Sequence, residues 1–512
     1  MPANIEEPTV RPKLKSRRFP SNEIIQEHLD RWHDTLMPQI NHALRGFYRK
    51  FPESVEISLE SIGETPQKAK PTILVVCTSV GKVKSILKRH FSYDSATYGL
   101  MVCRGKVMRS RKRAPKRSMA RDEEYVEPKN SHHQERPVNG ASIGAFAEGQ
   151  ALMPVSFGGL VMVDGEPFGL TVHHMLDVPS DSEGDDDDYS LPTIRSSDLE
   201  SGPAPLTTEA LEALGYELSD CDSETSSIAS SISSDASSAL EPGDIGGIAP
   251  DCAGGYLVTQ PALDDVDPRI FPSAETMTQD YLDSYTLGPL HASSGLRRRA
   301  CSLGLTHEID WALFRFSPGR APGENKVAGA PAGWPGTFIP TAQLAGLPVR
   351  AVARTSGVTQ GRIQRAVTTV KLRGRQTPSQ SFTVEGGLGV PGDSGAWVLA
   401  EGGACGHVLA WSEKRKVGYF CPMEIMFEDI RGTLGAGIVE FPGASGVEAG
   451  DEKEDEAMVE VEEVEEVEVL GDKEKMDDVG LSVYSLLKGG QVKDEVEEVD
   501  LVTGMEGMCV RA

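Results

Sequence analysis

The 512-residue sequence lacks the marks of a secreted or membrane-spanning protein. No apolar stretch follows Met1, so no signal peptide is expected. No apolar run of about 18 residues is present that could cross a membrane. The eight Cys are scattered, without a Cys-x-x-Cys pair. Scattered thiols favour a reducing compartment, so we expect an intracellular protein of the cytoplasm or nucleus.

Apolar and aromatic residues are scarce for a chain with room for two or three domains. Apolar side chains make up 39% and aromatic ones 6%, and the net charge is −26. Residues 451–500 alone hold 20 Asp and Glu against 5 Lys and Arg. Such a segment buries too little apolar surface to offset its ordering entropy. We expect 438–512 to be a disordered acidic tail, either solvated or docked on a basic protein partner or on the chain itself.

A second acidic segment, 178–245, interrupts the middle of the chain. It contains the run SDSEGDDDD and then a Ser-rich stretch. Long surface insertions cost little in closure entropy, so this composition predicts a disordered insertion within a loop of a folded domain. Strand-forming character returns at Gly254–Pro261 and again around Leu287–Ala292, where we expect the domain to resume.

The N-terminal part, 20–105, predicts a small α+β module. Apolar residues recur every three or four positions over Asn22–Lys50, which is typical of an amphipathic helix, with a bend at Pro38. The expected strands and further helix are Val55–Leu59, Thr72–Cys77, Tyr98–Cys103 and Lys82–His90. No function follows from these elements.

Residues 106–139 are predicted to be a linker with a basic start. Eight of the fourteen residues from Arg104 to Arg117 are Lys or Arg. A solvated linker, a nuclear-import signal, or a contact for the acidic tail or for phosphate backbones would each explain this run. Because the run contains no aromatic residue and the whole chain is acidic, nucleic acid is not expected as a partner.

The stretch 389–398 reads GVPGDSGAWV and places Ser394 between two glycines. A Ser on a tight turn before an apolar run suits a nucleophile. Gly392 would let the backbone bring its own N–H and that of Ser394 toward one point, where the oxyanion of a tetrahedral intermediate can be held. An ordinary glycine turn leading into a strand explains the same four residues equally well. The interpretation therefore depends on a base and an acid elsewhere.

Two upstream segments offer these groups. Residues 169–176 read GLTVHHML and end an apolar run at His174, and residues 308–314 read EIDWALF with Asp310 at the start of another run. His173 and His174 point to opposite faces of a strand, so at most one of them serves as a base. A metal site on this pair is not expected, because no Cys, Asp or Glu stands beside it at a ligand-like spacing. Asp310 alone is also compatible with a plain strand start.

Together the three segments resemble the His, Asp and Ser motifs of trypsin-like serine proteases, in the chain order of the chymotrypsin group. Thr-x-x-His falls on Thr171 and His174, and the other two motifs fall on Asp310–Leu313 and Gly392–Gly395. The resemblance covers 140–437, apart from the insertion. It implies a mainly β fold with two antiparallel six-stranded β-barrels and a cleft between them.

The resemblance implies a serine endopeptidase that acts on protein or peptide substrates without a cofactor or metal. Ser394 would attack the carbonyl carbon, His174 would transfer the proton, and Asp310 would orient His174. The N–H groups of Gly392 and Ser394 would form the oxyanion hole. The alternative is a catalytically idle protease-like scaffold whose acidic insertion and tail bind protein partners. No triad residue is substituted, which favours the enzyme.

The resemblance also implies a primary pocket and raises a question about activation. Leu388, six residues before the nucleophile, would lie at the pocket base, with Ala410 and Ser412 along its wall. A base without an acid favours a small or moderately apolar substrate side chain. Nothing like Ile-Val-Gly-Gly follows a basic residue, so Asp393 needs a partner other than a released N-terminus. The oligomeric state stays open.

Overall fold

The computed structural model describes residues 17–19, 24–109, 127–177, 241, 243–266, 279–331 and 333–443. The predicted acidic tail beyond residue 443, most of the predicted insertion and the basic run 110–126 lie outside the described residues.

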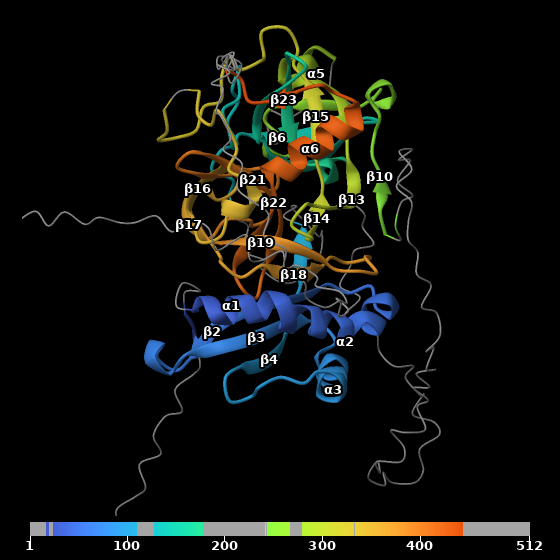
Figure 1. Cartoon of the computed structure of the whole chain (residues 1–512). Helices are drawn as coiled ribbons and strands as arrows, with labels where there is room; N and C mark the ends of the chain where they lie inside the picture. The colour runs from blue at the N-terminus through green and yellow to red at the C-terminus, as the bar shows by residue number, and fades with distance from the viewer. Residues whose placement is uncertain are drawn as a thin grey trace, which may run out of the picture. The chain divides into compact units, whose positions relative to one another are not determined.

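The N-terminal residues form helices packed on strands, as the periodicity predicts (Figure 1). Buried apolar side chains of the helices and of two central strands form one hydrophobic cluster. The predicted long helix is divided by a π-helical turn at Trp32–Leu36, and Pro38 stands in the first turn of the helix that follows. The elements are β1 (Arg17–Phe19), α1 (Gln26–Arg31), α2 (Met37–Lys50), β2 (Val55–Gly63), β3 (Lys70–Cys77), α3 (Val80–His90), β4 (Gly99–Arg104) and β5 (Val107–Arg109).

An antiparallel sheet follows, built around the segments that carry His174 and Asp310. Its order is β23-β8-β9-β15-β12-β11-β6-β7. Phe157, Leu170 and Phe314 belong to a buried hydrophobic cluster that also includes residues of later strands, such as Trp397 and Tyr419. The strands are β6 (Ser142–Ala147), β7 (Gln150–Ser156), β8 (Gly159–Val163), β9 (Glu166–Thr171), β11 (Leu257–Thr259), β12 (Thr286–Ser293), β15 (Ala312–Arg315) and β23 (Val439–Glu440).

A second sheet closes on itself and carries Ser394 at one end. The order β17-β16-β20-β21-β22-β19 returns to β17 through a further β17–β19 pairing, which makes a closed six-stranded antiparallel barrel. A buried cluster that includes Phe382, Val398 and Phe420 fills its interior. The strands are β16 (Pro348–Ala353), β17 (Gly357–Ile363), β19 (Ser379–Glu385), β20 (Trp397–Ala400), β21 (Gly403–Ser412) and β22 (Val417–Pro422).

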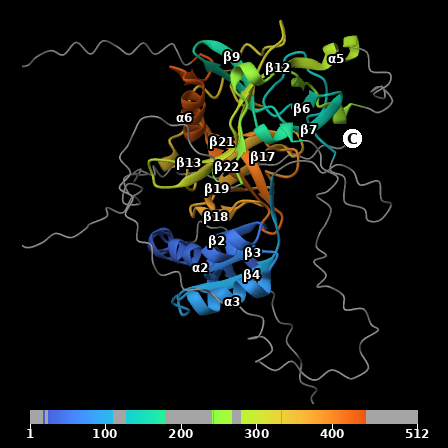
Figure 2. The ribbon, with the colours of Figure 1, turned by 90° about the vertical axis from the view of Figure 1, so that its right-hand side faces the viewer.

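The barrel sheet continues into the N-terminal strands. β18 (Thr368–Lys371) pairs with β19 on one side and with β2 on the other, and β3 and β4 follow outward. The N-terminal part is thus hydrogen-bonded to the barrel through a shared sheet. Figure 2 shows β18 next to β2 from a second direction.

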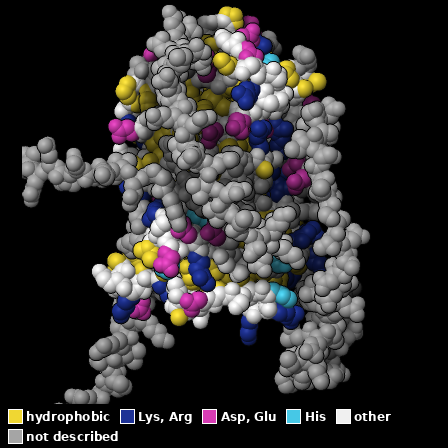
Figure 3. All heavy atoms as spheres, viewed as in Figure 1, with side chains coloured by type: hydrophobic (Ala, Val, Ile, Leu, Met, Phe, Trp, Pro, Cys, Tyr) yellow, Lys and Arg dark blue, Asp and Glu magenta, His cyan; other side chains and the backbone are white. Residues whose placement is uncertain are grey.

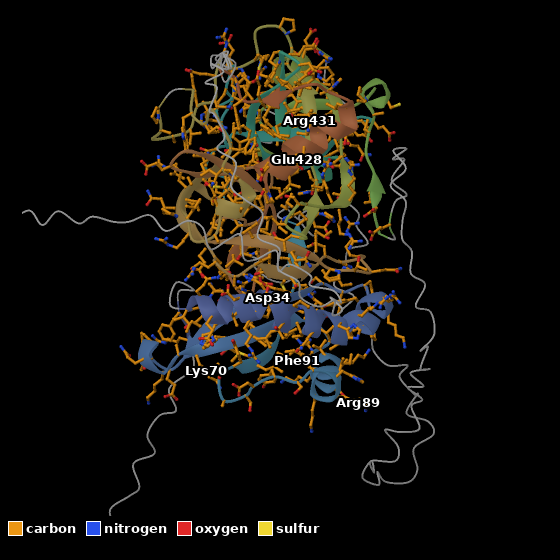
Figure 4. The ribbon with its side chains drawn as sticks, in the orientation of Figure 1. Asp34, Lys70, Arg89, Phe91, Glu428 and Arg431 are labelled. Carbon is orange, nitrogen blue, oxygen red and sulfur yellow. The ribbon has the colours of Figure 1, made fainter. Side chains whose placement is uncertain are left out.

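Few helices accompany the strands, so the predicted mainly β fold is confirmed. α6 (Met423–Leu434) packs on β21 and is amphipathic, because Glu428 and Arg431 lie on its exposed side (Figure 4) and Met426 and Ile430 are buried. The other elements are α5 (Gln279–Tyr285) and a small sheet of β10 (Ile245–Gly246), β13 (Gly295–Ala300) and β14 (Thr306–Ile309). Acidic and basic side chains are interspersed on the face in Figure 3. Within the described ranges, no helix is both long and apolar enough to cross a membrane.

Candidate active site

Ser394 lies in the tight turn that enters β20. The turn is held from both sides, because the Gly395 N–H donates to the Val408 carbonyl at 2.9 Å and the Ser394 carbonyl accepts from the Ser156 N–H at 2.8 Å. Gly395 has a φ of 87°, and a Cβ there would lie 2.5 Å from the Ser156 carbonyl oxygen. Glycine is therefore required for this close approach.

His174 and Asp310 are brought together by the pairing of β9 with β15. Thr171 at the end of β9 stands opposite Ala312 at the start of β15. His174 follows β9 in a short 3₁₀ turn, and Asp310 lies just before β15. The backbone N–H of His174 donates to Asp310 Oδ1 at 3.0 Å, which fixes the carboxylate beside the histidine.

The three side chains form one hydrogen-bonded chain. His174 Nδ1 lies 2.5 Å from Asp310 Oδ2, and His174 Nε2 lies 2.9 Å from Ser394 Oγ. An ionised carboxylate only accepts hydrogen bonds, so Nδ1 carries the proton and donates to Asp310. In the neutral ring, Nε2 is then the acceptor for the Ser394 hydroxyl. Asp310 and Ser394 are 136 and 220 positions from the histidine in the sequence, and folding brings them into contact.

The electrostatics keep the Asp310 carboxylate ionised. Burial raises its pKa, but the charge and hydrogen bond of His174 lower it more, and Arg109 lowers it further. The pKa of Asp310 therefore lies well below its usual value. The Arg109 Nε atom is 3.8 Å from Asp310 Oδ2.

Asp393, next to the candidate nucleophile, is capped by backbone amides. Its carboxylate accepts from the N–H groups of Thr355 (3.1 Å), Ser356 (2.9 Å) and Gly389 (3.1 Å). The side chain is fully buried, and burial raises the pKa of Asp393. Three neutral backbone N–H groups therefore bind the Asp393 carboxylate, for which the sequence analysis required a partner other than a released N-terminus. Gly392 precedes it with a φ of 97°.

Ser156, at the end of β7, ties the two sheets together and was missed by sequence reasoning. Its Oγ donates to the Gly392 carbonyl at 3.0 Å and accepts from the Arg354 N–H at 2.9 Å. Its carbonyl accepts from Thr171 Oγ1 at 2.9 Å. The Thr of the Thr-x-x-His pattern therefore supports the nucleophile turn through Ser156. A lone Ser before Phe-Gly-Gly gives no signal of this.

The neighbouring histidines and thiols make other contacts. His173 turns away from the triad, with its Nδ1 2.9 Å from Ser293 Oγ. Cys405, His407 and Cys421 are all buried in the barrel, and His407 stands opposite Cys421 in the β21–β22 ladder. Burial raises the pKa of Cys405 to about 12. Among the described residues, no group of three or more His, Cys, Asp or Glu side chains is arranged to hold a metal ion.

The three expected substrate-contact residues are placed differently from one another. Leu388 is 1% exposed and packs in the interior of the closed barrel. Ala410 and Ser412 lie on β21, where they pair with β5. The Ser412 hydroxyl donates to Glu56 Oε2 at 2.7 Å. Of the three, Ala410 and Ser412 therefore lie on the same edge of β21, whereas Leu388 lies inside the barrel.

Comparison with family models and with curated proteins finds no match. Solved structures that resemble the chain include proteases. Protease A of Thermobifida fusca shares 10% identity, covering 57% of this chain and 95% of its own, with a TM-score of 0.27. A glutamic acid-specific serine protease shares 12% identity over 59% and 98%, with a TM-score of 0.26. The chymotrypsin of Cellulomonas bogoriensis shares 17% over 29% and 84%, with a TM-score of 0.20. TM-scores this low carry no conclusion about activity.

Proposed function

We propose that this chain is a serine endopeptidase that cleaves protein or peptide substrates through an acyl-enzyme intermediate. The observation that supports it is the buried hydrogen-bonded chain from Asp310 through His174 to Ser394. A Ser hydroxyl is a weak nucleophile near neutral pH, and an imidazole with a pKa near 7 is the side chain suited to activate it.

In the proposed reaction, Ser394 Oγ bonds to the substrate carbonyl carbon as its proton passes to His174 Nε2. Asp310 holds the ring and stabilises the imidazolium that forms. The tetrahedral intermediate collapses, the C–N bond breaks, and the leaving amine takes the proton from His174. Water then attacks the ester with His174 again as base, which releases the acid and restores Ser394.

The oxyanion would be held by the N–H groups of Gly392 and Ser394. The support for a ready-formed hole is the anchoring of the Asp393 carboxylate by three backbone amides. Oxyanion-hole N–H groups that are already in position need not reorganise when negative charge develops on the substrate oxygen. This preorganisation is the main reason that they stabilise the transition state.

The test is covalent labelling with a fluorophosphonate probe, followed by peptide-library cleavage. The wild type should gain one probe mass on Ser394, and Ser394→Ala should gain none. Library turnover should fall by about 10⁶ in Ser394→Ala and by about 10⁴ in Asp310→Asn, which keeps the shape but disturbs the tautomer. The proposal would be refuted if the folded protein neither labels nor cleaves, in the wild type and in every other variant that keeps Asp310, His174 and Ser394.

A further inference from the structure

One strand of this chain already occupies the edge that runs past the candidate active site. β22 pairs with β21 over 406–412, and β20 pairs with β21 only over 403–407. The Gly395 N–H also donates to the Val408 carbonyl, and the Val408 N–H donates to the Ala396 carbonyl, so the second edge of β21 is open to another partner only beyond Val408. β5 takes that place, antiparallel, along Ala410–Ser412.

The register of β5 directs it toward the triad. Val107 stands opposite Ser412, Met108 opposite Trp411, and Arg109 opposite Ala410. Arg109 is the last residue of β5. Its Nε lies 3.8 Å from Asp310 Oδ2.

The start of β5 is fixed by the N-terminal part. The Val107 N–H donates to Ser54 Oγ at 3.0 Å, and the N–H of Gly105 donates to the Cys77 carbonyl at 3.2 Å. The Val107 side chain is 4% exposed and joins the hydrophobic cluster that contains both Phe314 and Tyr419. Met108 and Arg109 are only half-buried. The strand is thus anchored at one end and held mainly by ladder pairing and one ion pair at the other.

An extended peptide binds most simply to a protein by adding a strand to an open sheet edge, where main-chain hydrogen bonds give affinity. Ala410–Ser412 is such an edge beside the candidate nucleophile, and it is filled. Ser394 and His174 are both 0% exposed in this arrangement. A peptide cannot pair along Ala410–Ser412 while β5 does.

We propose that Val107–Arg109 is an internal occupant of the Ala410–Ser412 edge and competes there with extended peptide substrates. The inference rests on the serine endopeptidase function proposed above. The ion pair between Arg109 and Asp310 helps to hold this occupant on the edge. Substrate enters when β5 leaves the edge.

Internal competition has a distinct kinetic signature. The apparent KM increases with the population of molecules in which β5 occupies the edge, relative to those in which the edge is free. The value of kcat is unchanged, because molecules with a free edge are identical in the presence and absence of competition. Arg109→Ala removes the partly exposed ion pair and should lower KM roughly fivefold, which corresponds to about 1 kcal/mol. Met108→Pro removes a backbone N–H and disrupts the ladder, so a decrease of about tenfold or more is expected. Arg104→Ala, an exposed arginine on β4, is the matched control and should leave KM unchanged.

The assay measures kcat and KM for a peptide from the library screen, together with fluorophosphonate labelling of Ser394. A free acetyl-Lys-Val-Met-Arg amide should inhibit Met108→Pro competitively, and the same peptide with alanine last should inhibit more weakly. The melting temperature of each variant checks folding, and Arg109→Ala still decides the question if Met108→Pro unfolds.

The outcomes separate the two proposals. If Ser394 is labelled but KM is unchanged in both Arg109→Ala and Met108→Pro, the internal competitor is overturned and the endopeptidase proposal stands. The same holds if these variants change kcat instead of KM. Absence of labelling in the wild type and in every variant overturns the endopeptidase and the competitor with it. Decreased KM with constant kcat, and competition by the free peptide, support the proposal.

Discussion

Replacing Arg415 by Met tests whether a buried charge cluster holds the N-terminal part on the barrel. Arg415 lies in the β21–β22 turn, and its partners Glu56 and Glu60 lie on β2. Arg415 Nη1 is 2.5 Å from Glu56 Oε1, and Arg415 Nη2 is 2.5 Å from Glu60 Oε1. The three side chains are at most 1% exposed. Within the described residues, neither Glu60 oxygen makes a hydrogen bond of good geometry, so the carboxylate depends on nearby positive charge from Arg415 and, at 3.7 Å, Arg18.

Arg415→Met leaves two buried carboxylates without their main cation. Breaking a buried pair from one side costs about 3–5 kcal/mol, because the remaining charge is neither solvated nor compensated. For a folded region of this size, that loss lowers the melting temperature by roughly 10 °C. Calorimetry or circular dichroism at pH 7 measures it directly.

Two comparisons identify the cause. Lys68→Met removes the cation of an exposed pair, 3.8 Å from Glu64 with side-chain exposures of 71% and 44%, and should cost less than about 1 kcal/mol. Adding Glu56→Gln and Glu60→Gln to Arg415→Met removes the stranded charges and should restore much of the loss. The reasoning is refuted if Arg415→Met melts as close to the wild type as Lys68→Met does, or if the triple variant is no more stable than the single one.

Two further changes test a buried histidine on β21 and the nucleophile turn. Burial lowers the pKa of His407 from 6.5 to about 4, so its unfolded form binds a proton first, and stability is lost as pH falls from 6.5 toward 4. His407→Leu should remove that loss, about 2 kcal/mol at pH 5, and equal acid slopes in the two proteins would contradict this. Gly392→Ala places a Cβ at a φ of 97° and 2.3 Å from Thr355 Oγ1, so Ser394 labelling should slow at least about tenfold; an unchanged labelling rate would show that the turn tolerates the shift.

The candidate site was predictable because its signals are local. His174 follows a short apolar run, and Asp310 and Ser394 each precede one. These runs form strands β9, β15 and β20, and the three side chains meet beside the strand ends. The glycines around Ser394 also act over one or two residues. A sequence pattern can reveal such local features, because the glycines and apolar runs that position each side chain lie next to it in the sequence.

The contacts that surround the site were not predictable, because their partners are distant in sequence. Val55–Leu59 alternates like a strand with one exposed face, yet both faces of this part of β2 are buried. Glu56 is buried because Ser412 and Arg415, more than 350 positions away, supply its partners. Isolated Glu, Ser and Arg residues look like surface residues in a sequence. Only the pairing of β18 with β2 reveals where they meet.

Ser412 connects the charge cluster with the strand that occupies the candidate substrate edge. Its hydroxyl donates to Glu56, and its backbone pairs with Val107. Glu56 lies on β2, and the Val107 N–H is held by Ser54 just before β2, so loosening the cluster should also loosen β5. Arg415→Met should therefore lower KM for peptides at temperatures where the variant stays folded, with kcat unchanged. A variant with a decreased melting temperature and a wild-type KM would show that β5 keeps its edge by its own pairing, independently of how firmly β2 is attached.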